Sequence, residues 1–307
     1  MKHFILMTAF FSFIGMRLYA QTATVSSGTI QHFDYFSSIY VDSRNIDVWL
    51  PEDFSTEKKY AVLYMNDGQM LFDSSTSWNK QEWGVDETVG RLLKEKKIID
   101  CIVVAIWNTS KRNMEFFPRK PYNSLTQTQK DDLLAKTTSD KKTLFLMGAP
   151  VSDNYLKFIV QELKPFIDSS FPTKTDPKNT FIAGSSMGGL ISLYAICEYP
   201  HVFGGAACLS THWPGTFTVK NNPVPAEILS YFKENLPSPE NHKFYFDYGT
   251  ETLDAMYKPF QLQADEILKS KGYTPDNWIT REFKGQDHSE KAWRKRLEIP
   301  VVFLLGK

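Results

Sequence analysis

Short apolar segments alternate along the chain with segments of helical periodicity. Strand-like apolar runs fall at residues 28–36, 45–50, 60–65, 98–107, 178–183, 205–210, 243–248 and 278–283. Amphipathic or apolar helical patterns fall at residues 85–96, 152–169, 190–197, 225–235, 254–271 and 290–305. The run 98–107 is apolar almost throughout, which is typical of a strand buried on both faces. The alternation predicts an α/β fold with a mostly parallel central sheet, an antiparallel N-terminal edge, and helices on both faces.

Two segments stand outside this alternation. Residues 1–20 combine a basic start, an apolar run from Phe4 to Met16 and a small residue at Ala20, which predicts a signal peptide cleaved after Ala20. The apolar run is too short to span a bilayer, so we expect no stable membrane anchor. Residues 21–307 are expected to form a single domain of a secreted or periplasmic protein. The polar stretch 119–143 is expected to be an excursion over one face, either a lid or a solvated loop.

The composition is that of a globular chain without a charged tract. The 35 basic residues balance the 35 acidic ones, and loss of Lys2 and Arg17 with the signal peptide leaves a formal charge of −2. With no basic block, nothing indicates nucleic acid as a partner. The odd number of cysteines (Cys101, Cys197 and Cys208) predicts buried structural thiols rather than a disulfide framework. No His-Glu-x-x-His motif or Cys/His cluster is present, so no metal or other cofactor is expected.

The chemistry begins at Gly184-Ser185-Ser186-Met187-Gly188, which fits the G-x-S-x-G pattern of a nucleophile elbow. An apolar strand precedes it and an apolar helix follows, as the elbow requires. A sharp strand-to-helix turn forces the central residue into a strained conformation and pushes its hydroxyl above the sheet. The motif predicts that Ser186 is the nucleophile of a serine hydrolase or an acyltransferase; the alternative is a glycine-rich turn with an ordinary serine.

A serine nucleophile needs a histidine base, and His288 has the right place in the chain. In the fold that carries this elbow the order is serine, acid, histidine, with the histidine after the last strand. His288 follows the strand 278–283, whereas His212 follows the strand after the elbow and could line the site. The alternative for His288 is a solvated loop histidine.

The acid is expected after the strand 243–248, where Glu251 and Asp254 both occur. Asp254 is preferred, and Glu251 is the alternative acid. Asp247, or a serine–histidine dyad without an acid, also stays open. Either loop carboxylate could instead cap the helix that begins there.

An oxyanion hole needs a second backbone N–H from a loop after an earlier strand. The loop at residues 64–72 fits, and it predicts the N–H groups of Gln69 and Met187 as the two donors; a simple turn at Asn66-Asp67-Gly68 is the alternative. Trp107 and Trp213 follow two strands and are candidate substrate-binding residues, although core tryptophans would give the same pattern.

Four segments together resemble the putative-esterase group of α/β hydrolases, which includes esterase D-like, feruloyl, acetyl-xylan and enterochelin-type esterases. They are residues 65–73 (MNDGQMLFD), 112–118 (RNMEFFP), 184–189 (GSSMGG) and 285–288 (GQDH), within a resemblance spanning about residues 42–305. The resemblance implies an α/β-hydrolase fold and a carboxylic-ester hydrolase with Ser186 and His288 in its site. It also implies an Arg112–Glu115 pair beside that site. Several relatives have an acid three positions after the strand-end glycine, where this chain has Thr252.

These observations predict two-step acyl transfer on a small-molecule or glycan ester. The alternatives are acyl transfer to a sugar acceptor, a siderophore esterase, or a ligand-binding relative without catalysis. A Ser-x-x-Lys arrangement at residues 77–80 has no supporting motif and is interpreted as a chance pattern.

Overall fold

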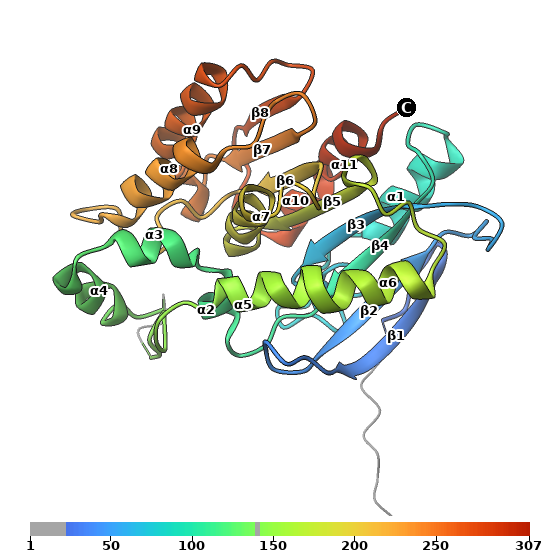
Figure 1. Cartoon of the computed structure of the whole chain (residues 1–307), viewed down its shortest axis with the longest axis horizontal. Coiled ribbons are helices and arrows are strands. Elements are labelled where there is room, and N and C mark those ends of the chain that lie inside the picture. The colour runs from blue at the N-terminus through green and yellow to red at the C-terminus, as the bar shows by residue number, and fades with distance from the viewer. Residues whose placement is uncertain (1–22, 139–141) are drawn as a thin grey trace, which may run out of the picture.

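The computed structural model describes residues 23–138 and 142–307, and the signal peptide predicted at residues 1–20 lies outside these ranges. The described chain forms an eight-stranded sheet with helices on both faces (Figure 1). The strands are β1 (Thr29–Phe36), β2 (Arg44–Leu50), β3 (Ala61–Asn66), β4 (Cys101–Ile106), β5 (Thr180–Ser185), β6 (Gly205–Leu209), β7 (Lys243–Gly249) and β8 (Trp278–Phe283). Their order across the sheet is β1-β2-β4-β3-β5-β6-β7-β8.

The sheet is antiparallel only at its N-terminal edge. β1 pairs with β2, and β2 with β4, in antiparallel fashion, whereas β3 to β8 form parallel pairs. The predicted α/β architecture and its antiparallel edge are therefore confirmed. The strand β4 is buried along its whole length, as its continuous apolar sequence predicted.

Successive side chains of each strand point to opposite faces, so the sheet separates two hydrophobic cores. In β3, Val62 and Tyr64 belong to one core, and Leu63 and Met65 to the other. The first core is closed by α5 (Ser152–Lys157), η2 (Phe158–Leu163), α6 (Lys164–Ser170), α7 (Met187–Glu198), α8 (Val224–Asn235) and α9 (Lys258–Ser270). The second is closed by α1 (Val85–Lys94), α10 (Glu290–Arg296) and α11 (Glu298–Leu305).

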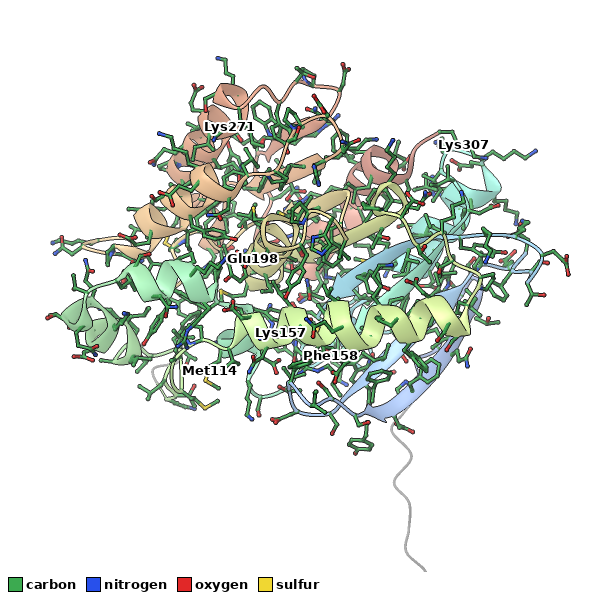
Figure 2. The ribbon with its side chains drawn as sticks, viewed as in Figure 1. Met114, Lys157, Phe158, Glu198, Lys271 and Lys307 are labelled. Atoms are coloured by element: carbon green, nitrogen blue, oxygen red, sulfur yellow. The ribbon has the colours of Figure 1, made fainter. Side chains whose placement is uncertain are left out.

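The helix predicted at residues 152–169 is present, although its middle is π-helical. α5, η2 and α6 form one long rod across the front of Figure 1, and Figure 2 labels Lys157 and Phe158 where α5 passes into the π-helical η2. The side chain of Phe158 is fully buried in the first core.

Two predicted helices are each divided. The helix expected at residues 254–271 is a separate 3-10 segment, η4 (Thr252–Met256), followed by α9. The helix expected at residues 290–305 is interrupted at Leu297 between α10 and α11. In both cases a proline lies in the first turn of the later helix (Pro259 and Pro300), and proline has no N–H to continue the preceding helical ladder. The break before α9 leaves Asp254 free to face the loop after β8.

The polar stretch 119–143 is largely helical where it is described. It forms α3 (Arg119–Ser124) and α4 (Gln127–Leu134), and α3 packs against α8. Tyr122, Leu125 and Leu133 are buried beneath it. The remaining short helices are η1 (Gly68–Met70), α2 (Arg112–Phe116) and η3 (Pro177–Asn179).

The three cysteines lie in the interior of the fold. Cys101, Cys197 and Cys208 are all free and buried, which agrees with structural thiols. Burial raises the pKa of the Cys101 thiol to about 12, so this thiol stays protonated at neutral pH. Within residues 23–138 and 142–307, no helix has the length and apolar character needed to cross a membrane.

Candidate active site

Ser186 occupies the turn between β5 and α7 in a strained backbone conformation. Its φ is 56° and its ψ is −121°, a region that residues with a side chain rarely adopt. The turn is tight enough that a Cβ on Gly184 would lie 2.6 Å from the backbone of Gly188. The required glycine and the strained serine are the features that the G-x-S-x-G motif predicted.

His288 lies in the loop between β8 and α10, where its ring bonds to a buried carboxylate. Its Nδ1 donates to Asp254 Oδ1 at 2.5 Å, and its main-chain N–H donates to Thr252 Oγ1 at 2.9 Å. The carbonyl of Gln286 in the same loop accepts the N–H groups of Thr250 and Glu251. These bonds join the loop after β7 to the loop after β8 and fix the histidine relative to the acid.

Of the carboxylates considered from the sequence, Asp254 is the one that contacts His288. Its side chain is fully buried. Burial acts to raise the pKa of Asp254, but hydrogen bonds from His288, Ser210 and the Gly249 N–H bring it below its usual value. The side chain of Glu251 is exposed and makes no bond to the histidine. Asp247 is buried in β7 and pairs with Arg296 instead.

Ser210, directly after β6, donates a hydrogen bond to Asp254. Its Oγ lies 2.6 Å from Asp254 Oδ2, 2.9 Å from Trp293 Nε1 and 2.8 Å from a terminal nitrogen of Arg296. Indole and guanidinium groups are donors only. The Ser210 oxygen therefore accepts from both of them, and its single proton is donated to Asp254.

A buried ion pair lies behind this serine. Arg296 donates to Asp247 Oδ1 at 2.8 Å, and Tyr245 donates to Asp247 Oδ2 at 3.0 Å. Burial outweighs the attraction of Arg296 and raises the pKa of Asp247 to about 6. Helix α10 thus connects to the site through both Trp293 and Arg296.

The two backbone donors predicted for an oxyanion hole both lie in the first turn of a helix. Met187 begins α7 and Gln69 lies within η1, and first-turn N–H groups have no acceptor within their own helix. Met187 lines the same cavity as Ser186, whereas Gln69 does not line it, although the nearby Asp67 and Met70 do. The Gln69 side chain is turned away to accept the N–H of Asn108 at 3.1 Å.

The predicted Arg112–Glu115 pair is wrong, because each residue has another partner. Arg112 forms a bidentate pair with Asp67, at 2.6 and 2.7 Å. Glu115 forms one with the buried Arg44 of β2, at 2.7 and 3.0 Å. Arg112 and Glu115 are three positions apart in α2 and could contact one another, but Glu115 is buried against Arg44 while Arg112 lines the cavity. The Arg112–Asp67 pair joins residues 45 positions apart, and no local pattern indicated it.

The two tryptophans predicted to bind substrate do not line the cavity. Trp213 is fully buried, stacks on Phe246 and donates to Gln261. Trp107 donates its Nε1 proton to Asp47 on the antiparallel side of the sheet. Three other tryptophans line the cavity instead, namely Trp78, Trp83 and Trp293. The core interpretation left open for Trp213 is therefore the correct one.

The cavity that contains Ser186 and His288 has a volume of about 590 Å³. His212 lines it as well, and its Nδ1 lies 2.7 Å from the hydroxyl of Tyr257. Burial, together with the charges of His288 and Arg112, lowers the pKa of His212 to about 3, so this imidazole is neutral at physiological pH. His288 is the histidine of this cavity that is joined to a carboxylate.

Ser186 lies close enough to Tyr257 to affect the pKa of that phenol. Burial and the nearby Asp254 charge raise the pKa of Tyr257, and hydrogen bonding from Ser186 opposes that rise. Among the described residues, no hydrogen bond joins Ser186 to His288 directly. Catalytic hydrogen bonds commonly tighten only when substrate binds.

The Ser-x-x-Lys residues at positions 77–80 do not form a catalytic pair. Ser77 Oγ bonds the carbonyl of Ser74 and Lys80 Nζ bonds that of Ser75, so the Ser-x-x-Lys residues do not act on one another. In the part of the chain that the structure describes, no group of three or more His, Cys, Asp or Glu residues is arranged to hold a metal ion.

Known proteins with related sequences include both characterised and uncharacterised chains. The uncharacterized protein YbbA of Bacillus subtilis is 23% identical over 272 residues, covering 86% of this chain and 94% of YbbA. Carboxylesterase SOBER1 of Arabidopsis thaliana is 25% identical and covers 55% of this chain and 77% of its own length. An endo-1,4-beta-xylanase/feruloyl esterase of Xylanibacter ruminicola is 25% identical over 91% of this chain, which spans 32% of that longer protein.

Solved structures share the fold at low sequence identity. The ferulic acid esterase of Anaeromyces mucronatus superposes with a TM-score of 0.62 and 19% identity, covering 93% of this chain and 92% of that one. The enterobactin esterase of Shigella flexneri gives a TM-score of 0.62 and 18% identity over 90% of this chain and 59% of that one. The sequence profile of the putative esterase family matches residues 37–299. The chain therefore belongs to the putative esterase family, with a carboxylesterase and a feruloyl esterase among its relatives.

Proposed function

We propose that the chain is a serine carboxylic-ester hydrolase that works through an acyl-enzyme intermediate. One observation carries this proposal: a strained elbow serine and a histidine joined to a buried carboxylate line the same cavity of about 590 Å³. Nucleophile, base and acid come from three separate loops, as expected for a catalytic triad.

In the first step, Ser186 attacks the ester carbonyl while His288 Nε2 takes its proton. Negative charge develops on the carbonyl oxygen, where the N–H groups of Met187 and Gln69 would donate hydrogen bonds. Asp254 accepts from Nδ1 of the imidazole, which keeps Nε2 free to act as the base and stabilises the imidazolium.

His288 then donates this proton to the departing alcohol, which leaves the acyl group on Ser186. In the second step, His288 activates a water molecule that attacks the acyl-enzyme. The low pKa of Asp254 keeps this carboxylate ionised in both steps. His212 is neutral and has its Nδ1 engaged by Tyr257, which separates its role from that of the base.

We further propose that the substrates are acyl esters of carbohydrates or similar small esters, and that the protein is secreted. The similarity to a xylanase/feruloyl esterase and the sequence of residues 1–20 support these two points. A hydrolysis panel of acetylated xylan, feruloylated oligosaccharide, a catecholate siderophore and aryl esters would rank the substrates. Adding a free sugar acceptor separates hydrolysis from acyl transfer. Mass analysis of the exported protein should show a chain beginning at Gln21.

The central test replaces the proposed nucleophile and base. Ser186→Ala and His288→Ala should each lower kcat for 4-nitrophenyl acetate by on the order of 10³-fold or more, with the far-ultraviolet circular dichroism spectrum unchanged. Asp254→Asn should lower kcat by on the order of 10²- to 10⁴-fold, because the histidine loses its orienting carboxylate. Glu251→Gln, an exposed carboxylate in the same loop, is the control and should keep full activity. Full activity in Ser186→Ala or His288→Ala would rule out the mechanism.

A further inference from the structure

Trp78 is exposed at the edge of the catalytic cavity. Its side chain is 77% exposed, and it lines the same cavity as Ser186 and His288. The other exposed large apolar side chains of the described residues, such as Ile39 and Leu262, lie away from this cavity. Large exposed aromatic surface beside a concave site is typical of a ligand-binding surface. We propose that Trp78 is the platform of a subsite that binds a neutral saccharide as the alcohol part of the ester, a proposal that rests on the proposed esterase function.

The loop that carries Trp78 is held by bonds within itself and to neighbouring segments. Ser77 and Lys80 each bond a main-chain carbonyl of the same loop, and Thr76 Oγ1 donates to the carbonyl of Gln69. At the end of the loop, Glu82 accepts from Arg294 of α10. An aromatic ring on a loop fixed in this way loses little conformational entropy when a ligand stacks on it.

The same loop lies on the side of the cavity where the leaving alcohol must be. Asn79 donates to Glu290 at 2.7 Å, two residues beyond His288. The ring of Trp83 lies 5.4 Å from that of Trp293, which in turn lies 5.0 Å from the ring of His288. The general acid protonates the leaving oxygen, so the alcohol part of the ester has to lie next to His288. The position of the loop therefore assigns Trp78 to the alcohol and not to the acyl group.

The polar groups around Trp78 favour a neutral alcohol with several hydroxyl groups. Arg112 is paired with Asp67, and the Glu290 carboxylate accepts a hydrogen bond from Asn79. Gln81 and Asn79 both line the cavity, and their amide groups can donate and accept hydrogen bonds. An aromatic face beside amide groups and a hydrogen-bonded carboxylate matches the apolar and polar faces of a sugar ring.

The test uses substrate pairs that form the same acyl-enzyme but release different alcohols. The pairs are acetylated xylotriose with 4-nitrophenyl acetate, and feruloylated xylo-oligosaccharide with methyl ferulate. Trp78→Ala should raise KM for at least one saccharide ester about tenfold, equivalent to about 1.4 kcal/mol of lost binding. Its kcat/KM for the two small esters should stay within about twofold of the wild type. Trp78→Phe should keep part of the saccharide affinity, and the control Ile39→Ala, equally exposed but outside the cavity, should behave as the wild type.

The outcomes separate the subsite from the esterase function. A wild-type protein that hydrolyses none of the four esters contradicts the proposed function itself. If the wild type hydrolyses the small esters, the subsite is overturned by any of three results: no hydrolysis of either saccharide ester, no effect of Trp78→Ala on them, or an equal loss on both members of a pair. Inhibition of 4-nitrophenyl acetate hydrolysis by free xylotriose gives an independent measurement. The inhibition constant should rise in Trp78→Ala and not in Ile39→Ala.

Discussion

The hydroxyl group of Ser210 helps to orient Asp254, because the hydrogen bonds around its oxygen leave one direction for its proton. Because Trp293 and Arg296 can only donate to its oxygen, its proton is committed to Asp254 Oδ2. Ser210 also has a positive φ of 43°, which directs its side chain toward this cluster. The acid of the proposed triad is thus held by three donors, namely His288, Gly249 N–H and Ser210.

Removing this hydroxyl should weaken catalysis without abolishing it. In Ser210→Ala, Asp254 loses one donor while Trp293 and Arg296 lose their acceptor, so the carboxylate is less firmly held against the imidazole. We expect kcat to fall about tenfold with little change in KM, which corresponds to about 1.4 kcal/mol, the size of one hydrogen bond to a charged group. Steady-state kinetics on 4-nitrophenyl acetate measures both parameters.

Thr211→Val is the matched control for this prediction. Thr211 is equally buried and adjacent in sequence, but among the described residues its hydroxyl bonds only the carbonyl of Cys208. Its loss should affect stability more than kcat. An unchanged kcat in Ser210→Ala, or an equal loss in both variants, would show that Ser210 does not act through Asp254.

Individual site residues differed in how far the sequence could predict them. Ser186 and His288 could be placed because a local motif and the chain order of the fold constrain them. Asp254 was preferred but not separated from Glu251, since that choice depends on which side chain faces inward after Thr252. The roles of Ser210 and Arg112 depend on partners more than 40 positions away, and no spacing rule reaches that far.

At the scale of elements, the Asp67–Arg112 pair joins η1 to α2 at the edge of the cavity. Asp67 precedes η1 in a left-handed conformation, with φ of 59°, and accepts both Arg112 and the amide of Asn108. A residue in this conformation persists only when its surroundings hold it. The bidentate pair therefore fixes the turn that presents the Gln69 N–H.

Arg112→Lys should keep the charge but lose the two parallel hydrogen bonds. The η1 turn would then be held less firmly, and the Gln69 N–H, the proposed second oxyanion donor, would be misplaced. We expect kcat to fall by on the order of 10- to 100-fold with KM changed less than about threefold, because an oxyanion donor acts mainly in the transition state. Lys111→Arg, an exposed neighbour paired with Asp42, is the control. A rise in KM with unchanged kcat would instead place Arg112 in substrate binding.

The type and order of the elements were predictable from the sequence, but their ends were not. Strand periodicity and continuous apolar runs locate all eight strands, because a strand buried on one or both faces needs apolar residues at the buried positions. The breaks before α9 and α11 depend on single prolines, and the helical periodicity continues through both of them. The helices α3 and α4 lie in a polar stretch, and α3 is stabilised by packing on α8, which cannot be predicted from local composition.

At the scale of the whole molecule, the parallel part of the sheet gathers the site at one edge. The loops after the carboxyl ends of β3, β5, β7 and β8 supply Gln69, Ser186, Asp254 and His288 respectively. In open parallel sheets, ligands bind at this edge. The loop after β4 adds Arg112, and the loop after β6 adds Ser210 and His212, so all six parallel strands contribute to the cavity or its support.

The buried Asp247 beneath this edge should make the stability of the whole molecule depend on pH. Its pKa is raised to about 6 in the folded state, whereas an unfolded aspartate titrates near its ordinary value of 3.8. Between these values the folded protein binds a proton that the unfolded chain has lost, so stability should fall as pH rises from about 4 to 6. Asp254 has the opposite sign: its pKa is lowered, so its contribution is lost only as pH falls below the ordinary value.

Asp247→Asn removes this titration and keeps the shape of the side chain. The unpaired Arg296 lowers the stability of the variant by an amount that is constant with pH, because arginine stays charged throughout. The free energy of unfolding of the wild type relative to Asp247→Asn should therefore decrease by up to about 3 kcal/mol from pH 4 to pH 7, since a tenfold change in proton affinity corresponds to about 1.4 kcal/mol. Urea denaturation followed by tryptophan fluorescence at intervals of half a pH unit measures this difference. Glu251→Gln controls for the loss of one negative charge from the protein. A difference that stays constant, or that grows with pH, would mean that Asp247 is ionised throughout this range and that Arg296 outweighs the cost of burial.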